Sequence, residues 1–225
     1  MNPTRTKLLV AAADCVRVDG VAGTSARAIA ARAGVNQALV FYHFGTVSEL
    51  VEAACRQALD EAVERHRGQL AGVSSLAGLL NAGKQLHEAE RAVGNVAMMA
   101  QLMSGAARDP VLARAARYAM DRWCAEIEPT IARLLHGSPL AELTDASGLA
   151  RAVCASFIGL ELYEAADPEA AAGALSALER LAVLAEALDD LGPVAKRAVR
   201  ARLARAGGSS VTERAGRRRS SKDRG

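Results

Sequence analysis

The sequence predicts an all-α protein. Apolar residues make up 51% of the 225 residues and charged residues 24%, which is the balance of a globular chain with a core of its own. Aromatic residues make up only 3%, and the β-branched and aromatic runs that are typical of strands are nearly absent. Alanine, the strongest helix former, is the commonest residue type. An all-β or α/β architecture is therefore disfavoured.

The first helix is expected over residues 5–19. Apolar side chains recur there at helical spacing, at Leu8, Leu9, Ala12, Cys15 and Val16. Gly20 follows directly, and glycine commonly ends a helix because it adopts the left-handed conformation without strain. This segment is therefore expected to form an amphipathic helix.

The next residues predict two short helices joined by a tight turn. Thr24-Ser25 supplies an N-cap for a helix over 26–33, which Gly34 ends after about two turns. Asn36 is expected to cap a third helix over 37–43. Two short helices separated by a glycine turn form the helix-turn-helix pattern.

The remainder of the chain also predicts helices. Thr46 and Glu49 have the spacing of a capping box and are expected to open a long helix. Asp109-Pro110 and Asp167-Pro168 each combine an N-cap with proline at the first helical position. Pro129 is expected to kink or end the helix that contains it. The expected helices after the long one cover 75–90, 92–107, 110–136, 147–166, 168–191 and a basic amphipathic segment at 194–206.

Charge divides the chain into three parts. Residues 1–45 carry five basic and two acidic side chains, residues 46–193 carry twelve basic and twenty-one acidic, and residues 194–225 carry eleven basic and two acidic. We therefore expect an N-terminal domain over 1–46, a larger helical domain over 47–193 and a basic tail over 194–225 that is largely disordered from Gly207. The tail either is a solvated terminus or adds electrostatic attraction to DNA.

Several classes of protein are excluded or disfavoured. The sequence has no run of about 18 uncharged apolar residues for a membrane span, and its N-terminus does not predict a secretory signal. We expect a cytoplasmic protein with no membrane partner. The four cysteines are far apart and are interpreted as buried apolar residues, with a redox sensor as the alternative.

The sequence predicts neither an enzyme nor a cofactor. It contains no glycine-rich phosphate loop, no GxSxG or HExxH motif and no pair of histidines at i, i+4. We therefore expect no catalytic residues, no cofactor and no metal site. Glu88 and Glu90 next to His87 are interpreted as a solvated helix face.

The segment from Thr24 to Phe44, followed by Glu49-Leu50, resembles the DNA-binding domain of the tetracycline-repressor (TetR) family. That family has a Thr/Ser cap, an Ile-Ala pair in its second helix, an Ala-Gly-Val turn, an aromatic–His/Tyr–Phe ending and a capped fourth helix. The resemblance covers about residues 5–55. Val47 departs from the pattern, since the family usually has a lysine there, and one phosphate contact is expected to be lost.

The resemblance implies a DNA-binding surface on the second and third helices. The third helix would enter the major groove, with Gln37, Leu39 and Phe41 toward base edges, and Arg27 would also reach the groove. Glutamine pairs with adenine and arginine with guanine in a bidentate manner, which suits these roles. Of Phe41 and Tyr42, one is expected to pack partly inward and the other to face outward, and a structural role for His43 is the alternative to a phosphate contact. The expected set is Thr24, Arg27, Gln37, Ala38, Leu39, Phe41, Tyr42 and His43.

A homodimer is expected because one short recognition helix contacts few base pairs, whereas a two-fold dimer contacts two half-sites. The last two long helices each carry an apolar stripe that would join a four-helix bundle between subunits. The alternative is that these stripes pack within one subunit. The stripes consist of Leu149, Val153, Phe157 and Leu160 in one helix and Leu175, Leu178, Leu181 and Leu188 in the other.

The larger domain is expected to hold a small-molecule effector. His87, Met99, Met103 and Trp123 lie in its central helices and are the expected pocket residues. The resulting hypothesis is a transcriptional regulator, expected to be a repressor that a ligand releases from a palindromic operator. The alternative is a DNA-binding regulator without a small-molecule ligand, which the lack of a cavity above a few hundred Å3 would favour. An α-helical enzyme or carrier is a further alternative.

Overall fold

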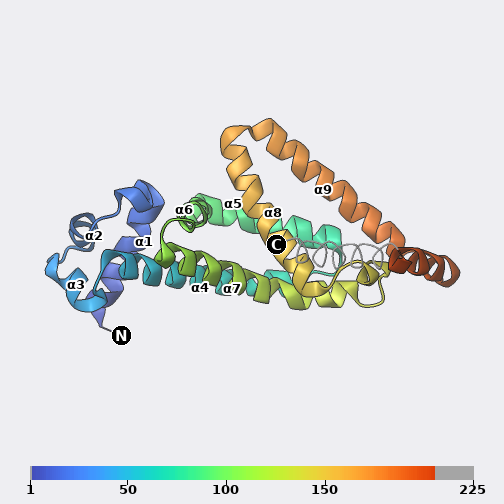
Figure 1. Ribbon diagram of the computed structural model, residues 1–225, viewed down its shortest axis with the longest axis horizontal. Coiled ribbons are helices and arrows are strands. Elements are labelled where there is room, and N and C mark those ends of the chain that lie inside the picture. Colours follow the sequence, from blue (N-terminus) through green and yellow to red (C-terminus); the bar gives the residue numbers. More distant parts are fainter. Residues whose placement is uncertain (1, 206–225) are drawn as a thin grey trace, which may run out of the picture.

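The computed structural model describes residues 2–205, and every regular element in that range is helical. Figure 1 shows an elongated molecule with the first three helices gathered at one end and the last described helix at the other. The order is α1 (Pro3–Gly23), α2 (Ala26–Ala33), α3 (Ala38–Phe44), α4 (Val47–Ala71), α5 (Leu76–Val93), α6 (Asn95–Gly105), α7 (Pro110–Leu135), the 3-10 helix η1 (Pro139–Glu142), α8 (Ala146–Ala166) and α9 (Pro168–Asp189), followed by a helix at 193–205.

Local signals place the first three helices as expected. Gly20 has a φ of 75° and interrupts α1, which resumes for one short turn before α2. The Ser25 side chain accepts a hydrogen bond from the backbone N–H of Ala28, and Gly34 ends α2 with a φ of 64°. The Asn36 Oδ1 atom accepts from the Ala38 N–H at 2.8 Å and so caps α3. The helix-turn-helix prediction is therefore confirmed, with α3 shifted by one residue.

The core of the N-terminal helices continues into the rest of the molecule. Leu8, Ile29, Val40 and Leu50 are all fully buried in it. The same cluster includes Leu102 of α6, and residues of α7 also contribute. The N-terminal unit therefore packs directly on α4, α6 and α7.

The helix α7 continues through Pro129, so the helix does not end there. Proline removes one backbone hydrogen bond, but the surrounding packing retains the helix. Buried Ile131 follows directly, Thr130 Oγ1 donates to the Leu70 carbonyl at 3.1 Å, and Arg133 Nη2 donates to the Val73 carbonyl at 2.8 Å. These contacts hold the last turns of α7 against the end of α4.

The described C-terminal part ends in a helix. The helix at 193–205 agrees with the expected basic helix, whereas the predicted disordered tail from Gly207 lies outside the described residues. Up to residue 205, none of the helices combines the length and the apolar character that crossing a bilayer requires.

Candidate nucleic-acid interface and effector cavity

The inner face of α3 fixes its position on the N-terminal core. Val40 is fully buried, and Leu39 and Phe44 pack partly against the same cluster. The guanidinium of Arg5 lies over the Phe44 ring, 4.9 Å from its centroid, which is a cation–π distance. The helix is thus held from one side only, and its other side faces outward.

The outer face of α2 and α3 presents most of the residues expected to contact DNA. Gln37 and Ala38 are exposed, Phe41 is 49% exposed and Tyr42 is 81% exposed. Phe41 is therefore the ring that packs partly inward and Tyr42 the one that faces outward, which agrees with the expectation. The exposed Arg27 of α2 makes no hydrogen bond or ion pair within residues 2–205. Its guanidinium is available for a base or a phosphate.

Three other residues of the expected set also make contacts within the domain. Thr24 is half-buried, and its hydroxyl donates to the Gly20 carbonyl at 2.7 Å, which closes the turn between α1 and α2. Leu39 is half-buried against the core, so only part of its side chain faces outward. The His43 ring lies edge-on to Tyr42, with 4.9 Å between centroids. His43 therefore supports the position of the Tyr42 ring.

A cavity of about 130 Å3 lies among α4, α5, α6, α7 and α8. Its walls are almost entirely apolar, and His87, Met99 and Trp123 line it as expected. Met103 does not line this cavity, which corrects that assignment, because it packs against the N-terminal core. The volume is below the range of about 300–1,000 Å3 typical of small-molecule sites. The cavity therefore suits a compact apolar molecule.

The structure corrects part of the expected dimer stripe on α8. Val153 and Phe157 line the cavity, and Leu149 packs against a buried cluster of the same chain. Leu160 and Leu175 line a recess between α8, α9 and α5. For Leu149, Val153 and Phe157 the alternative of packing within one subunit holds, because this face of α8 meets α7 and α6 and borders the cavity. The role of Leu160 and Leu175 in a dimer stays a prediction.

The opposite faces of α8 and α9 remain exposed. Only Ala150 and Cys154 are buried in α8, and only Ala171 in α9, although both helices exceed 20 residues. Leu181 is 60% exposed, as a dimer residue would be in a single chain. Sequence reasoning missed the other exposed apolar side chains of these helices, which are Leu162, Tyr163, Val183 and Leu184.

A buried polar network connects the cavity wall to the N-terminal domain. Glu90 of α5 is only 4% exposed and lines the cavity with Asn95 of α6. Its carboxylate accepts hydrogen bonds from Arg65 at 2.8 Å and from Asn95, and it lies 2.9 Å from His66 Nε2. The Asn95 Oδ1 atom in turn accepts from Arg17 Nε of α1 at 3.0 Å. A continuous chain of hydrogen bonds thus runs from α4 and α5 to α1.

The electrostatics of this network favour a charged Glu90. Burial raises the pKa of its carboxyl, but hydrogen bonds from Arg65, Asn95 and His66 together outweigh burial and hold the pKa below its usual range. Glu90 is therefore part of a buried network and not of the solvated face that the sequence suggested.

The cysteines are all buried, as expected, and are free thiols. Burial raises the pKa of the Cys55 thiol to about 12 and also raises that of Cys154, which lies beside Cys124. Thiols with raised pKa values are poor nucleophiles, so these environments disfavour the redox-sensor alternative.

Comparison with known proteins matches the N-terminal domain to a family. The model for bacterial regulatory proteins of the tetR family matches residues 8–54. No curated protein matches the sequence. A solved structure described as a transcriptional regulator from Streptomyces coelicolor A3(2) is 25% identical, with a TM-score of 0.62, over 80% of this chain and 99% of that one.

Two further structures share the fold. One, described as a TetR-family transcriptional regulator from Rhodococcus sp., is 22% identical with a TM-score of 0.65, over 80% of this chain and 99% of that one. The multidrug-binding protein EbrR, complexed with imidazole, is 25% identical with a TM-score of 0.56, over 79% of this chain and 96% of that one. With the tetR-family match over the helix-turn-helix and this fold around it, residues 8–54 form a DNA-binding domain similar to that of the tetR family of bacterial regulatory proteins, within the fold that TetR-family transcriptional regulators share.

Proposed function

We propose that this regulator is a repressor, which binds a palindromic operator as a homodimer and is released by a small apolar effector. In this proposal α3 enters the major groove, Gln37 and Phe41 contact base edges, and Arg27 contacts a base or a phosphate. Residues 1–46 bind DNA, and residues 47–193 bind the effector and the second subunit. The exposed outer face of α2 and α3 supports the first part of the proposal.

The proposed dimer face consists of the outward sides of α8 and α9. Small exposed residues on α8, such as Ala155 and Gly159, precede the exposed Leu162 and Tyr163 on the same side of the helix. Small side chains permit close approach of helices, and exposed apolar side chains of this size favour burial against a partner. The proposed face is made of exposed residues, which are Ala152, Ala155, Gly159, Leu162 and Tyr163 of α8 with Ala177, Leu181, Val183 and Leu184 of α9.

The observation that carries effector control is the double role of α6. Met99 and Leu102 of this helix line the cavity, while Asn95 and Gln101 bond it to α1. The Gln101 Oε1 atom accepts from the Val21 N–H at 2.7 Å, directly before the helix-turn-helix. A molecule that displaces α6 therefore moves α1 and changes the spacing of the two recognition helices. The change in DNA binding that the effector causes is limited by the difference between the effector's affinities for the two conformations.

A regulator without a small-molecule effector is the second candidate, which the modest cavity volume favours. Benzene distinguishes the two, since an apolar cavity of about 150 Å3 accommodates it. Trp123 is the only tryptophan and lines the cavity, so its fluorescence reports occupancy. Saturable changes in fluorescence together with weaker operator binding support effector control. Unchanged fluorescence and unchanged DNA affinity support the second candidate.

Replacing Gln37 is expected to relax sequence preference. Gln37→Ala removes a side chain that forms a bidentate pair with adenine, and such a pair discriminates by about 1–3 kcal/mol. Bound duplexes selected from a random pool should then show a weaker base preference at one symmetric pair of operator positions. The base preferences at the other positions should be unchanged. An identical profile for the Gln37→Ala variant and the wild type would contradict this role.

Replacing Tyr42 is expected to weaken binding without changing preference. Tyr42→Phe removes one hydroxyl from an 81% exposed ring, and a lost phosphate hydrogen bond costs about 0.5–1.5 kcal/mol. Fluorescence anisotropy should show a similar loss, roughly 2- to 10-fold, for the selected operator and for its single-base variants. Equal affinity to the wild type on all of these duplexes would remove Tyr42 from the interface.

A further inference from the structure

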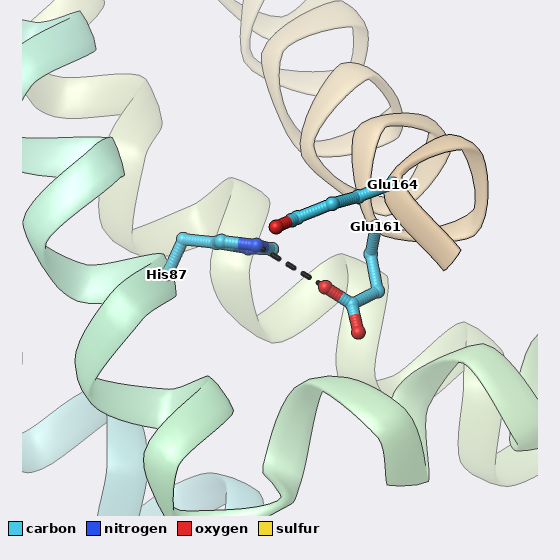
Figure 2. A group of neighbouring side chains, drawn as sticks. All are labelled: His87, Glu161 and Glu164. Carbon is cyan, nitrogen blue, oxygen red and sulfur yellow. Dashed lines mark ion pairs between the residues drawn. The ribbon is translucent and has the colours of Figure 1, made fainter. Parts of the chain in front are cut away.

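Three potential metal ligands meet between α5 and α8. His87 lies on α5, and Glu161 and Glu164 lie three residues apart on α8. One ligand atom from each of these residues lies within 4.8 Å of the other two. Figure 2 shows the His87 ring directed toward both carboxylates. The His87 Nε2 and Glu161 Oε2 atoms are 3.2 Å apart, which is close to the separation of two ligands around one ion at bond lengths of about 2.0–2.2 Å.

The Glu161 carboxylate forms an ion pair with His87 but accepts no hydrogen bond at its buried Oε2 atom among the described residues (Figure 2). The side chains of Glu161 and His87 are each only 16% exposed, and the Glu161 Oε2 atom is buried without a hydrogen-bond partner among the described residues. A buried carboxylate oxygen without a donor is costly, and most such atoms in proteins are paired or bind an ion. The position between Glu161 and His87 is therefore one where a cation would be stabilised.

The neighbouring basic groups leave lone pairs of the carboxylates available to bind an ion. Arg91 forms an ion pair with Glu164, and Lys84 pairs with Glu179 of α9 at 2.7 Å. A carboxylate has two oxygens and about four lone-pair directions, so Glu164 is able to hold Arg91 and an ion together. The His87 ring is also held by Phe157, with 6.0 Å between ring centroids. Packing thus keeps the imidazole directed toward the carboxylates.

We propose that His87, Glu161 and Glu164 bind a divalent first-row transition ion such as Zn2+. One imidazole and two carboxylates are a ligand set that Zn2+ accepts, and three protein ligands leave at least one coordination position open. His87 lines both the apolar cavity and the recess between α5, α8 and α9. The open position is therefore available to water or to an oxygen or nitrogen atom of a bound molecule. This site replaces the expectation of no metal and does not depend on the proposed effector control.

The test is titration of the chelator-treated full chain with Zn2+ by isothermal calorimetry, followed by substitution with Co2+ for absorption spectroscopy. We expect one Zn2+ site per chain. In His87→Ala and in Glu161→Gln its affinity should fall by about 10-fold or more, because loss of a group that supports a metal ligand already lowers metal affinity by about 10-fold or more, and loss of the ligand itself should cost at least as much. The matched controls are His136→Ala, which removes an exposed histidine, and Glu179→Gln, which removes a carboxylate in the same region. Both controls should bind as the wild type does.

Two results would overturn the proposal. One is the absence of stoichiometric Zn2+ binding by the wild type. The other is unchanged binding by both His87→Ala and Glu161→Gln, which would place the ion at surface groups elsewhere. Glu161→Gln is nearly isosteric, and its circular dichroism is expected to match the wild type. Because no DNA is present, failure of this test leaves the proposed repressor function separately measurable.

Discussion

The substitution Leu181→Glu is expected to convert the protein to monomers and to weaken operator binding by about 100-fold or more. Leu181 is 60% exposed in the single chain and lies at the centre of the proposed face of α9. A charge there would be buried against the second subunit without a partner, which opposes association. Two recognition helices linked in one dimer bind the two half-sites with an affinity about two to four orders of magnitude above that of one helix alone. A monomer loses this gain in affinity for the operator.

Sedimentation velocity and anisotropy on the selected operator measure these two effects. Leu143→Glu is the matched control, because Leu143 is 51% exposed but lies outside α8 and α9. The control is expected to remain a dimer with wild-type affinity. A Leu181→Glu variant that is still dimeric at micromolar concentration would place the subunit interface elsewhere.

The substitution Glu90→Ala is expected to lower the free energy of unfolding by about 2–4 kcal/mol, because it leaves buried donors without an acceptor. Asn95 is 9% exposed and would lose its bond to Glu90, and His66 would lose the acceptor that lies 2.9 Å from its Nε2 atom. The midpoint of thermal unfolding should fall by roughly 5–15 °C for a chain of this length. The control is Glu179→Ala, which breaks the partly exposed ion pair between Lys84 and Glu179. It should change the free energy of unfolding by less than about 1 kcal/mol.

The effect of Glu90 should also depend on pH. Its pKa is lowered in the folded protein, so the carboxylate stabilises the fold fully above the unfolded pKa of about 4.3 and loses this effect as the pH falls through the folded value. The difference in unfolding free energy between wild type and Glu90→Ala should therefore be constant from about pH 6 to 7. It should shrink below about pH 4. Denaturant titrations at these pH values measure it, and a difference that grows on acidification would contradict the lowered pKa.

The helix-turn-helix could be predicted from the sequence because its signals are local. Ser25, Gly34 and Asn36 each act within three residues of the helix end that they define. Caps and left-handed glycines depend little on the rest of the fold. For the same reason Thr46 was placed correctly as the cap of α4, where its side chain accepts from the Glu49 N–H.

The interior of the larger domain depends on contacts between distant segments. Periodicity showed that Val153 and Phe157 share a stripe with apolar neighbours, but α8 has a second apolar face, and only the packing shows which of them borders the cavity. Arg17 and Asn95 are 78 residues apart in sequence, and neither has a local pattern that indicates the other.

The position of His87 illustrates the same limit on local reasoning. The sequence places Glu88 and Glu90 beside it, whereas the fold turns Glu90 toward Arg65 and brings Glu161 and Glu164 to His87 from another helix. Pro129 shows the converse, because a strong local signal for a helix end is overruled by the contacts of Thr130 and Arg133 with the end of α4.

Selection of duplexes from a random DNA pool by the purified full chain at low salt tests the central proposal most directly. If α3 enters the major groove twice per dimer, the recovered sequences should contain two inverted half-sites about one helical turn or more apart. Recovery of no preferred duplex, or of a single half-site by a dimeric protein, would contradict the account.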